Sequence, residues 1–143
     1  MVSKSKVLGK SSIIFITVGT TNFPFDRLFT AIDNALSELR SETQLIVQTG
    51  NSSYKWKYKT IRLHKYLGTN EIENLLKIAD KIVTHAGCGT LYVINQQHSS
   101  TPLVVARLKR FGEHVDDHQK YFLKYFRSTL PLKFQYTFVT DVT

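Results

Sequence analysis

The feature that most constrains the fold is a regular alternation of short apolar runs with helical segments along the 143-residue chain. Residues 13–18 form a β-branched run that ends in Gly19-Thr20-Thr21. After Pro24, apolar residues recur every three or four positions, as on the buried face of a helix: Phe25, Leu28, Phe29, Ile32, Leu36 and Leu39. This alternation predicts right-handed βαβ units, and therefore an α/β fold with a doubly wound, mostly parallel sheet.

The rest of the chain continues the pattern. It predicts further strands over residues 44–48, 59–63, 81–84, 102–106 and 135–139, and a helix over about 90–97. Asn70 with Glu73, and Asp116 with Gln119, have the spacing of a capping box and predict two more helix starts, the second leading into Leu123, Phe126 and Leu130. We expect a flexible basic tail over residues 1–12 and a single domain over residues 13–143.

The charge and cysteine content limit the function. The net charge of +8, from 19 basic and 11 acidic residues, suits an anionic partner such as a phosphorylated substrate, a phospholipid surface or a nucleic acid. The single cysteine excludes a disulfide framework and a cysteine-only zinc site. No apolar run approaches the roughly 20 residues of a membrane span, so we expect a cytoplasmic protein.

Two glycine-containing turns are the first candidates for a binding site, since ligands of such sheets bind at the carboxyl ends of the strands. Gly19-Thr20-Thr21 follows the first strand, and His85-Ala86-Gly87-Cys88-Gly89-Thr90 lies between a strand and a helix. Glycines let the backbone approach a ligand, and the amides of a helix N-terminus favour an anion. The second turn therefore predicts phosphate binding, with a plain turn around a core-packed His85 as the alternative. For Cys88 we expect a small buried residue rather than a nucleophile.

A third candidate is the polar stretch 107–119, which follows a strand and precedes a helix. It suits sugar hydroxyls or phosphates, or it is a solvated loop in which Asp116 caps the helix. Its ligand-type residues His114, Asp117 and His118 have no strong metal-site spacing, so no metal is expected.

The fourth candidate is the alternation of aromatic residues and lysines over residues 54–59. As a strand, it has an aromatic face and a basic face. We interpret it as an exposed edge strand or a docking surface rather than a nucleic-acid site, because no RNA-binding signature accompanies it.

Taken in order, these pieces resemble the C-terminal, nucleotide-sugar-binding half of the glycosyltransferase family 28 group. They are most similar to stand-alone small subunits of two-chain glycosyltransferases, such as the bacterial PssE- and EpsF-type subunits of capsule and exopolysaccharide synthesis. They are also similar to the soluble subunit that helps add the second GlcNAc to the dolichol-linked precursor. The resemblance runs through residues 13–21, 47–51, 84–90 and 111–119, where Gly-Glu-His-Val-Asp-Asp-His-Gln is the most specific match.

The resemblance implies a Rossmann-like GT-B C-terminal half. Such a subunit binds the UDP-sugar donor, and the two-chain enzyme transfers a hexose to a lipid-linked acceptor without a metal or other cofactor. A membrane-associated, acceptor-binding partner then holds the chain at the cytoplasmic membrane face and supplies the catalytic base, and no nucleic acid is expected to bind.

The same resemblance assigns residues to the donor site. Gly87, Cys88, Gly89 and Thr90 would bind the pyrophosphate beside His85, and Gly19, Thr20 and Thr21 would line the cleft. His118 and Gln119 would face the donor sugar, in a pocket shaped by Glu113, His114, Asp116 and Asp117. Val93 replaces a glutamate that binds the ribose in this family, which keeps a non-catalytic activator open as an alternative. A basic nucleic-acid-binding domain is the third alternative.

Overall fold

The computed structural model describes residues 12–38, 42–97, 102–129 and 137–139. The predicted tail lies outside these residues except for Ser12, and so do Leu39 and Leu130.

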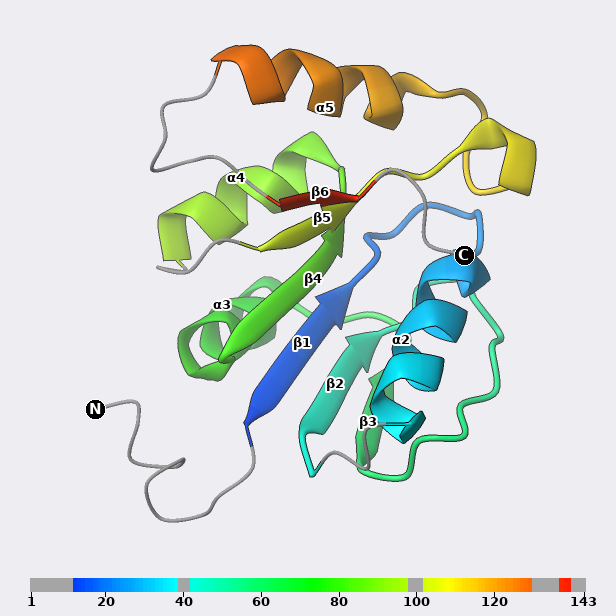
Figure 1. Cartoon of the computed structure of the whole chain (residues 1–143). Coiled ribbons are helices and arrows are strands. Elements are labelled where there is room, and N and C mark those ends of the chain that lie inside the picture. The colour runs from blue at the N-terminus through cyan, green and yellow to red at the C-terminus, as the bar shows by residue number, and fades with distance from the viewer. Residues whose placement is uncertain (1–11, 39–41, 98–101, 130–136, 140–143) are drawn as a thin grey trace.

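The strands form one parallel sheet, as the sequence predicts (Figure 1). Its order is β3-β2-β1-β4-β5-β6, and every neighbouring pair is parallel. The strands are β1 (Ile13–Thr17), β2 (Gln44–Gln48), β3 (Ile61–His64), β4 (Lys81–His85), β5 (Leu103–Val105) and β6 (Thr137–Val139). The chain adds β2 and β3 on one side of β1 and then returns to place β4 on the other side. The direction of winding therefore reverses between β1 and β4, where Rossmann-like folds bind their ligands.

Helices cover both faces of the sheet (Figure 1). The helix α2 (Asp26–Glu38) packs on one face against Ile16 and Leu45. On the other face, α3 (Thr69–Ile78) and α4 (Cys88–Gln97) pack against Phe15 and Ile46, and α5 (His118–Thr129) adds Leu123 beside α4. The alternation of faces along β1 and β2 follows from the two-residue period of a strand. No helix in the described part of the chain is long and apolar enough to cross a bilayer.

Two helix starts differ from the sequence prediction. The first is α3, which begins at Thr69, so the capping box predicted at Asn70 is wrong: Glu71 Oε1 instead accepts the backbone N–H of Gly68 at 3.0 Å. The second is α4, which begins at Cys88 rather than near residue 90, so that Gly89 and Thr90 lie in its first turn.

The stretch 54–59 keeps its predicted alternation, but its residues belong to no strand of the described sheet. Its aromatic side chains face the core, where Tyr54 and Trp56 pack on Phe29 of α2. The buried carboxylate of Asp33 accepts hydrogen bonds from the Tyr54 hydroxyl at 2.6 Å and from two backbone N–H groups of the segment. The edge-strand interpretation is therefore wrong: the segment is tied to α2, and its lysines face solvent.

Candidate functional site

A cavity of about 480 Å³ opens at the carboxyl ends of β1 and β4, at the point where the winding reverses. Thr17 of β1 and Gln48 of β2 pair in register, and the Thr17 hydroxyl donates to Gln48 Oε1 at the cavity floor. The turns after β1 and β4 form its walls. The cavity lies where a doubly wound sheet is expected to bind a ligand.

The His85 side chain separates the two glycine turns. A Cβ added to Gly19 would lie 2.6 Å from the His85 ring, and one added to Gly87 would lie 2.4 Å from it. Gly19 also has a φ of 74°, which only glycine adopts without strain. Both glycines are therefore required by the packing of His85. By contrast, a Cβ on Gly89 would meet nothing within 4 Å.

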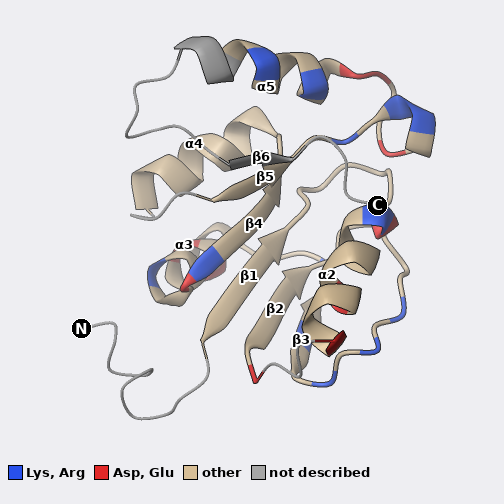
Figure 2. Cartoon of the chain, in the orientation of Figure 1, with Lys and Arg blue, Asp and Glu red and all other residues tan. Residues whose placement is uncertain are grey.

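The polar groups around the cavity are uncharged hydrogen-bonding groups. Among the described residues that line it there is no Asp, Glu, Lys or Arg. Threonine hydroxyls come from Thr20, Thr21 and Thr90, and the first turn of α4 adds backbone N–H groups that have no acceptor within the helix. Figure 2 shows that β1 and the carboxyl half of β4 carry no charged residue. Neutral donors at a helix N-terminus suit an anionic group such as a phosphate.

The stretch after β5 begins with a buried arginine, which holds other parts of the structure together. Arg107 is 1 % exposed, and its Nη1 donates to the carbonyls of Phe23 at 3.0 Å and Pro24 at 3.2 Å. Its Nη2 donates to the carbonyl of Val18, directly before Gly19. Burial lowers the pKa of Arg107 to about 10, so that the guanidinium stays protonated at neutral pH. This side chain ties the turn after β1 to the turn after β5.

Glu113 completes the same network. Arg27 of α2 donates to both of its carboxylate oxygens at 2.9 Å, and the backbone N–H of Leu108 donates to Oε1 at 2.9 Å. Glu113 is buried and does not line the cavity. The structure therefore gives Glu113 a place in the scaffold that holds the loop against α2, rather than in the pocket.

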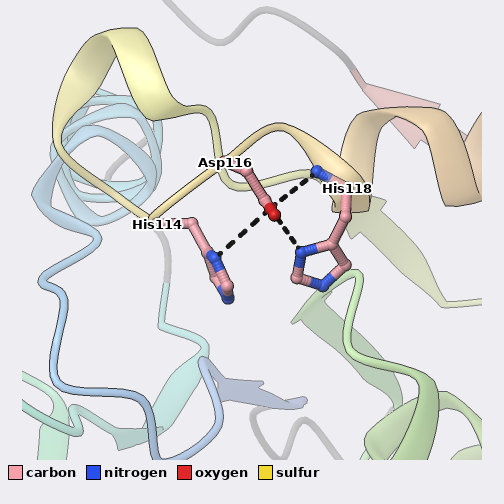
Figure 3. Close-up of side chains that lie close together, drawn as sticks. All are labelled: His114, Asp116 and His118. Carbon is pink, nitrogen blue, oxygen red and sulfur yellow. Dashed lines mark hydrogen bonds and ion pairs between the residues drawn. The ribbon is translucent and has the colours of Figure 1, made fainter.

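Two histidines and one carboxylate cluster at the edge of the cavity (Figure 3). The carboxylate Oδ1 of Asp116 lies 2.7 Å from His118 Nδ1 and also accepts the His118 backbone N–H at 3.0 Å. These bonds lower the pKa of Asp116. The His114 ring packs edge-on against the His118 ring, with centroids 4.5 Å apart, and burial lowers the pKa of His114.

In the described part of the chain, this cluster also brings three ligand-type atoms within 4.8 Å of one another. However, His114 Nδ1 already accepts the backbone N–H of Val115, and Asp116 Oδ1 already binds His118. Each of the three residues thus already uses one of its ligand-type atoms in a bond within the cluster or to the backbone. The set differs from the sequence candidate in that Asp116 replaces Asp117, whose Oδ1 accepts the Lys109 backbone N–H.

The structure brings together most of the predicted site residues. Those that line the cavity are Gly19, Thr20, Thr21, His85, Gly87, Gly89, Thr90, His114 and Gln119. Those that do not are Cys88, Glu113, Asp116, Asp117 and His118. The prediction that Cys88 is buried is wrong, because it is exposed at the first position of α4. Nor does Gln119 form the predicted box with Asp116, since its amide bonds to Ala86, Arg107 and His85.

Sequence reasoning missed a set of wall residues from other elements. Leu67 and Thr69 lie after β3, and Ile72 and Leu76 of α3 and Ile94 of α4 extend the cavity between the two helices. Leu67 and Thr69 could have been found, because they follow a strand whose carboxyl end reaches the same edge of the sheet. The α3 and α4 residues carry no such signal, because apolar helix residues are expected in a core.

The comparison with protein families agrees with this arrangement, whereas no curated protein matches the chain. A model of the glycosyltransferase family 28 C-terminal domain matches residues 13–130, which include both glycine turns and the stretch after β5. With its parallel sheet and the cavity at the reversal point, the chain belongs to the glycosyltransferase family 28 C-terminal domain family, and it is a sugar-donor-binding domain of glycosyltransferase type.

Proposed function

We propose that this chain is the donor-binding subunit of a two-chain glycosyltransferase that transfers a hexose from a UDP-sugar to a lipid-linked acceptor. The acceptor half and the catalytic base come from a membrane-associated partner, which holds the chain at the cytoplasmic membrane face. The product belongs to capsule or exopolysaccharide synthesis. The chain uses no metal or other cofactor.

The observation that carries this proposal is the cavity between the two glycine turns. Its threonine hydroxyls and the first turn of α4 offer neutral donors to a diphosphate. Such preorganised donors stabilise the charge that develops on the departing UDP. The apolar side chains of Leu67 and Ile72 on the same cavity suit the flat face of a nucleobase.

A second candidate function is supported by Val93. Its side chain lines the cavity at the position where the family resemblance implies a ribose-binding glutamate. An apolar wall there removes a hydrogen bond to the ribose, and a subunit that has lost nucleotide binding would serve to stabilise a catalytic partner.

Calorimetry separates the two functions. UDP and the UDP forms of glucose, galactose, glucuronate and GlcNAc are titrated into the chain alone and into the chain co-purified with a glycosyltransferase encoded beside it. Thr30→Val serves as a control for a cavity variant such as Thr90→Val, because Thr30 lies on the exposed surface of α2 and does not line the cavity. Binding that is unchanged in this control, with sugar transfer to the lipid fraction by the complex, supports the donor subunit. If neither the chain alone nor the complex binds a nucleotide, the donor-subunit function is contradicted, and the non-catalytic activator is the function that is left.

A further inference from the structure

Three side chains from separate elements form a hydrogen-bonded row along the cavity. Gln119 at the start of α5 contacts His85 at the end of β4, with Nε2 and Nδ1 3.3 Å apart. The other ring nitrogen, His85 Nε2, lies 3.2 Å from the Oγ1 of Thr90 in the first turn of α4. Gln119 and His85 are buried, whereas Thr90 is partly exposed on the cavity wall.

The direction of each hydrogen bond in this row follows from Gln119. Its Oε1 accepts the backbone N–H groups of Ala86 and Arg107, each at 3.1 Å. Because two donors converge on that atom, it is the oxygen, and the amide NH₂ faces His85. An NH₂ group only donates, so His85 Nδ1 is an acceptor and carries no proton.

The proton of His85 therefore lies on Nε2, which donates it to the hydroxyl oxygen of Thr90. Burial favours the same neutral form, since it lowers the pKa of His85 to about 3. Because Thr90 Oγ1 accepts from His85, its own O–H points elsewhere, and the cavity is the open space beside it.

We propose that Gln119 and His85 are positioning residues that turn the Thr90 hydroxyl into a fixed hydrogen-bond donor toward the cavity. The subsite therefore takes a group that only accepts hydrogen bonds, such as a fully ionised diphosphate oxygen of a nucleotide. This inference rests on the proposed function, because it names the part of the donor that this hydroxyl binds.

The packing of His85 keeps the row in place. Its ring fills the space between Gly19 and Gly87, where any added Cβ would collide with it. The ring therefore cannot turn to exchange its two nitrogens without moving both turns. A hydroxyl whose partner is held in this way loses less rotational freedom when a ligand binds, which favours affinity.

The first test is the protonation of His85 in the free protein. A long-range ¹H–¹⁵N spectrum of the histidine rings at pH 7 distinguishes the two neutral forms, and His85→Phe identifies the His85 signals by their loss. The expected result is a proton on Nε2. A proton on Nδ1, or on both nitrogens, would overturn the proposal whatever the protein binds.

The second test is a double-mutant cycle with UDP as the probe, measured by calorimetry. Thr90→Val removes the hydroxyl, and the loss of a hydrogen bond to a charged group predicts a Kd about 10- to 100-fold higher. Thr90→Ser restores most of the affinity. His85→Phe keeps a ring between the glycines and releases the hydroxyl, so that Kd rises by roughly 3- to 10-fold in the wild-type background but less than twofold in Thr90→Val.

The two hypotheses fail in different ways. Losses that add in the double variant mean that His85 acts only by packing, and they overturn the positioning role alone. Wild-type protein that binds no UDP, alone or with its partner, overturns the proposed function and this subsite with it. Circular dichroism and thermal melting of each variant confirm that the fold is kept before its Kd is compared.

Discussion

The turn after β4 and the longer loop after β5 reach the same edge of the sheet but serve it in different ways. The turn over residues 85–90 has no Asp, Glu, Lys or Arg, and it gives the cavity a hydroxyl, two glycines and the start of α4. The loop over residues 107–119 is rich in charges, but Arg107 bonds to the turn after β1 and Glu113 bonds to Arg27 of α2. Only His114 and Gln119 of that loop line the cavity.

The comparison shows that the density of chemistry-bearing residues in a motif is a poor guide to contact with a ligand. A buried charge must be paired, so the charged side chains of a loop at the edge of a core tend to bond to other groups of the protein. Neutral donors on a glycine turn have no such requirement, and they remain available to a ligand.

The largest expected effect is on the β5 loop. Glu113→Ala leaves Arg27 without its carboxylate partner and the Leu108 backbone N–H without its acceptor, and breaking such a buried pair predicts a loss of about 3–5 kcal/mol in the free energy of unfolding. Urea denaturation measures this loss. Asp117→Ala, in the same loop, removes only a bond to the Lys109 backbone and serves as the control. A loss for Glu113→Ala no larger than that of the control would contradict the scaffold role.

A related change on the β4 turn tests steric demand rather than charge. Gly87→Ala places a Cβ 2.4 Å from the buried His85 ring, and this overpacking predicts a loss of about 1–3 kcal/mol. The same denaturation experiment measures it. If the additional effect of Gly87→Ala vanishes in a His85→Ala background, the clash with the ring is the cause, whereas an unchanged effect would rule the ring out.

The buried His85 also predicts a pH dependence of stability. Its pKa is lowered to about 3, so between the unfolded value near 6.5 and 3 the unfolded chain binds the extra proton, and stability falls as the pH falls. Between pH 7 and pH 5 this single group accounts for a loss of about 2 kcal/mol. His85→Phe should show a correspondingly smaller decrease in urea denaturation, and equal decreases in both proteins would show that His85 is not the cause.

Between pH 7 and pH 5, the effect of His85 on stability can be distinguished from that of Asp33. Burial alone raises the pKa of Asp33, but hydrogen bonds from Tyr54, Lys57 and Tyr58 outweigh it, and the pKa is lowered. A carboxyl group with a lowered pKa stabilises the fold at a pH above the pKa of the unfolded chain. This stabilisation is lost as the pH falls through the pKa of the folded chain, which lies below the window of pH 7 to 5.

The smallest effect on stability is expected for the lysines of the stretch 54–59. Lys55, Lys57 and Lys59 are exposed, so changing all three to Glu should alter the free energy of unfolding by no more than about 0.5 kcal/mol per site. If these lysines dock the chain on an anionic membrane or on the partner, co-sedimentation with anionic liposomes or the partner should weaken. Unchanged sedimentation in both would exclude the docking role.

Much of the fold follows from the sequence because period and position are local signals. The β-branched run at Ile13–Thr17 and the three-four repeat of α2 each identify their element, and the parallel order follows from their alternation. The glycine turns were found because Gly19 and Gly87 follow strands. The start of α3 was missed because a glycine cap gives a weaker signal than Asn70.

The roles of charged residues could not be predicted in the same way. Whether Glu113 faces a ligand or Arg27 depends on how α2 lies against a loop 86 residues away in the chain. Likewise, the fate of the Gln119 amide depends on Ala86, 33 residues before it. Such long-range pairings are set by packing and leave no periodic trace in the sequence.

The most direct test of a donor site at the start of α4 compares wild-type protein with Gly89→Ala. The added methyl meets no protein atom within 4 Å, and alanine in a helix predicts a gain of up to about 1 kcal/mol in stability. The same methyl lies on the cavity wall, where a diphosphate would approach the backbone of α4. If a diphosphate binds there, the variant is at least as stable as wild type but binds UDP at least tenfold more weakly in calorimetry. Equal UDP affinity in the two proteins would contradict a donor site at the start of α4.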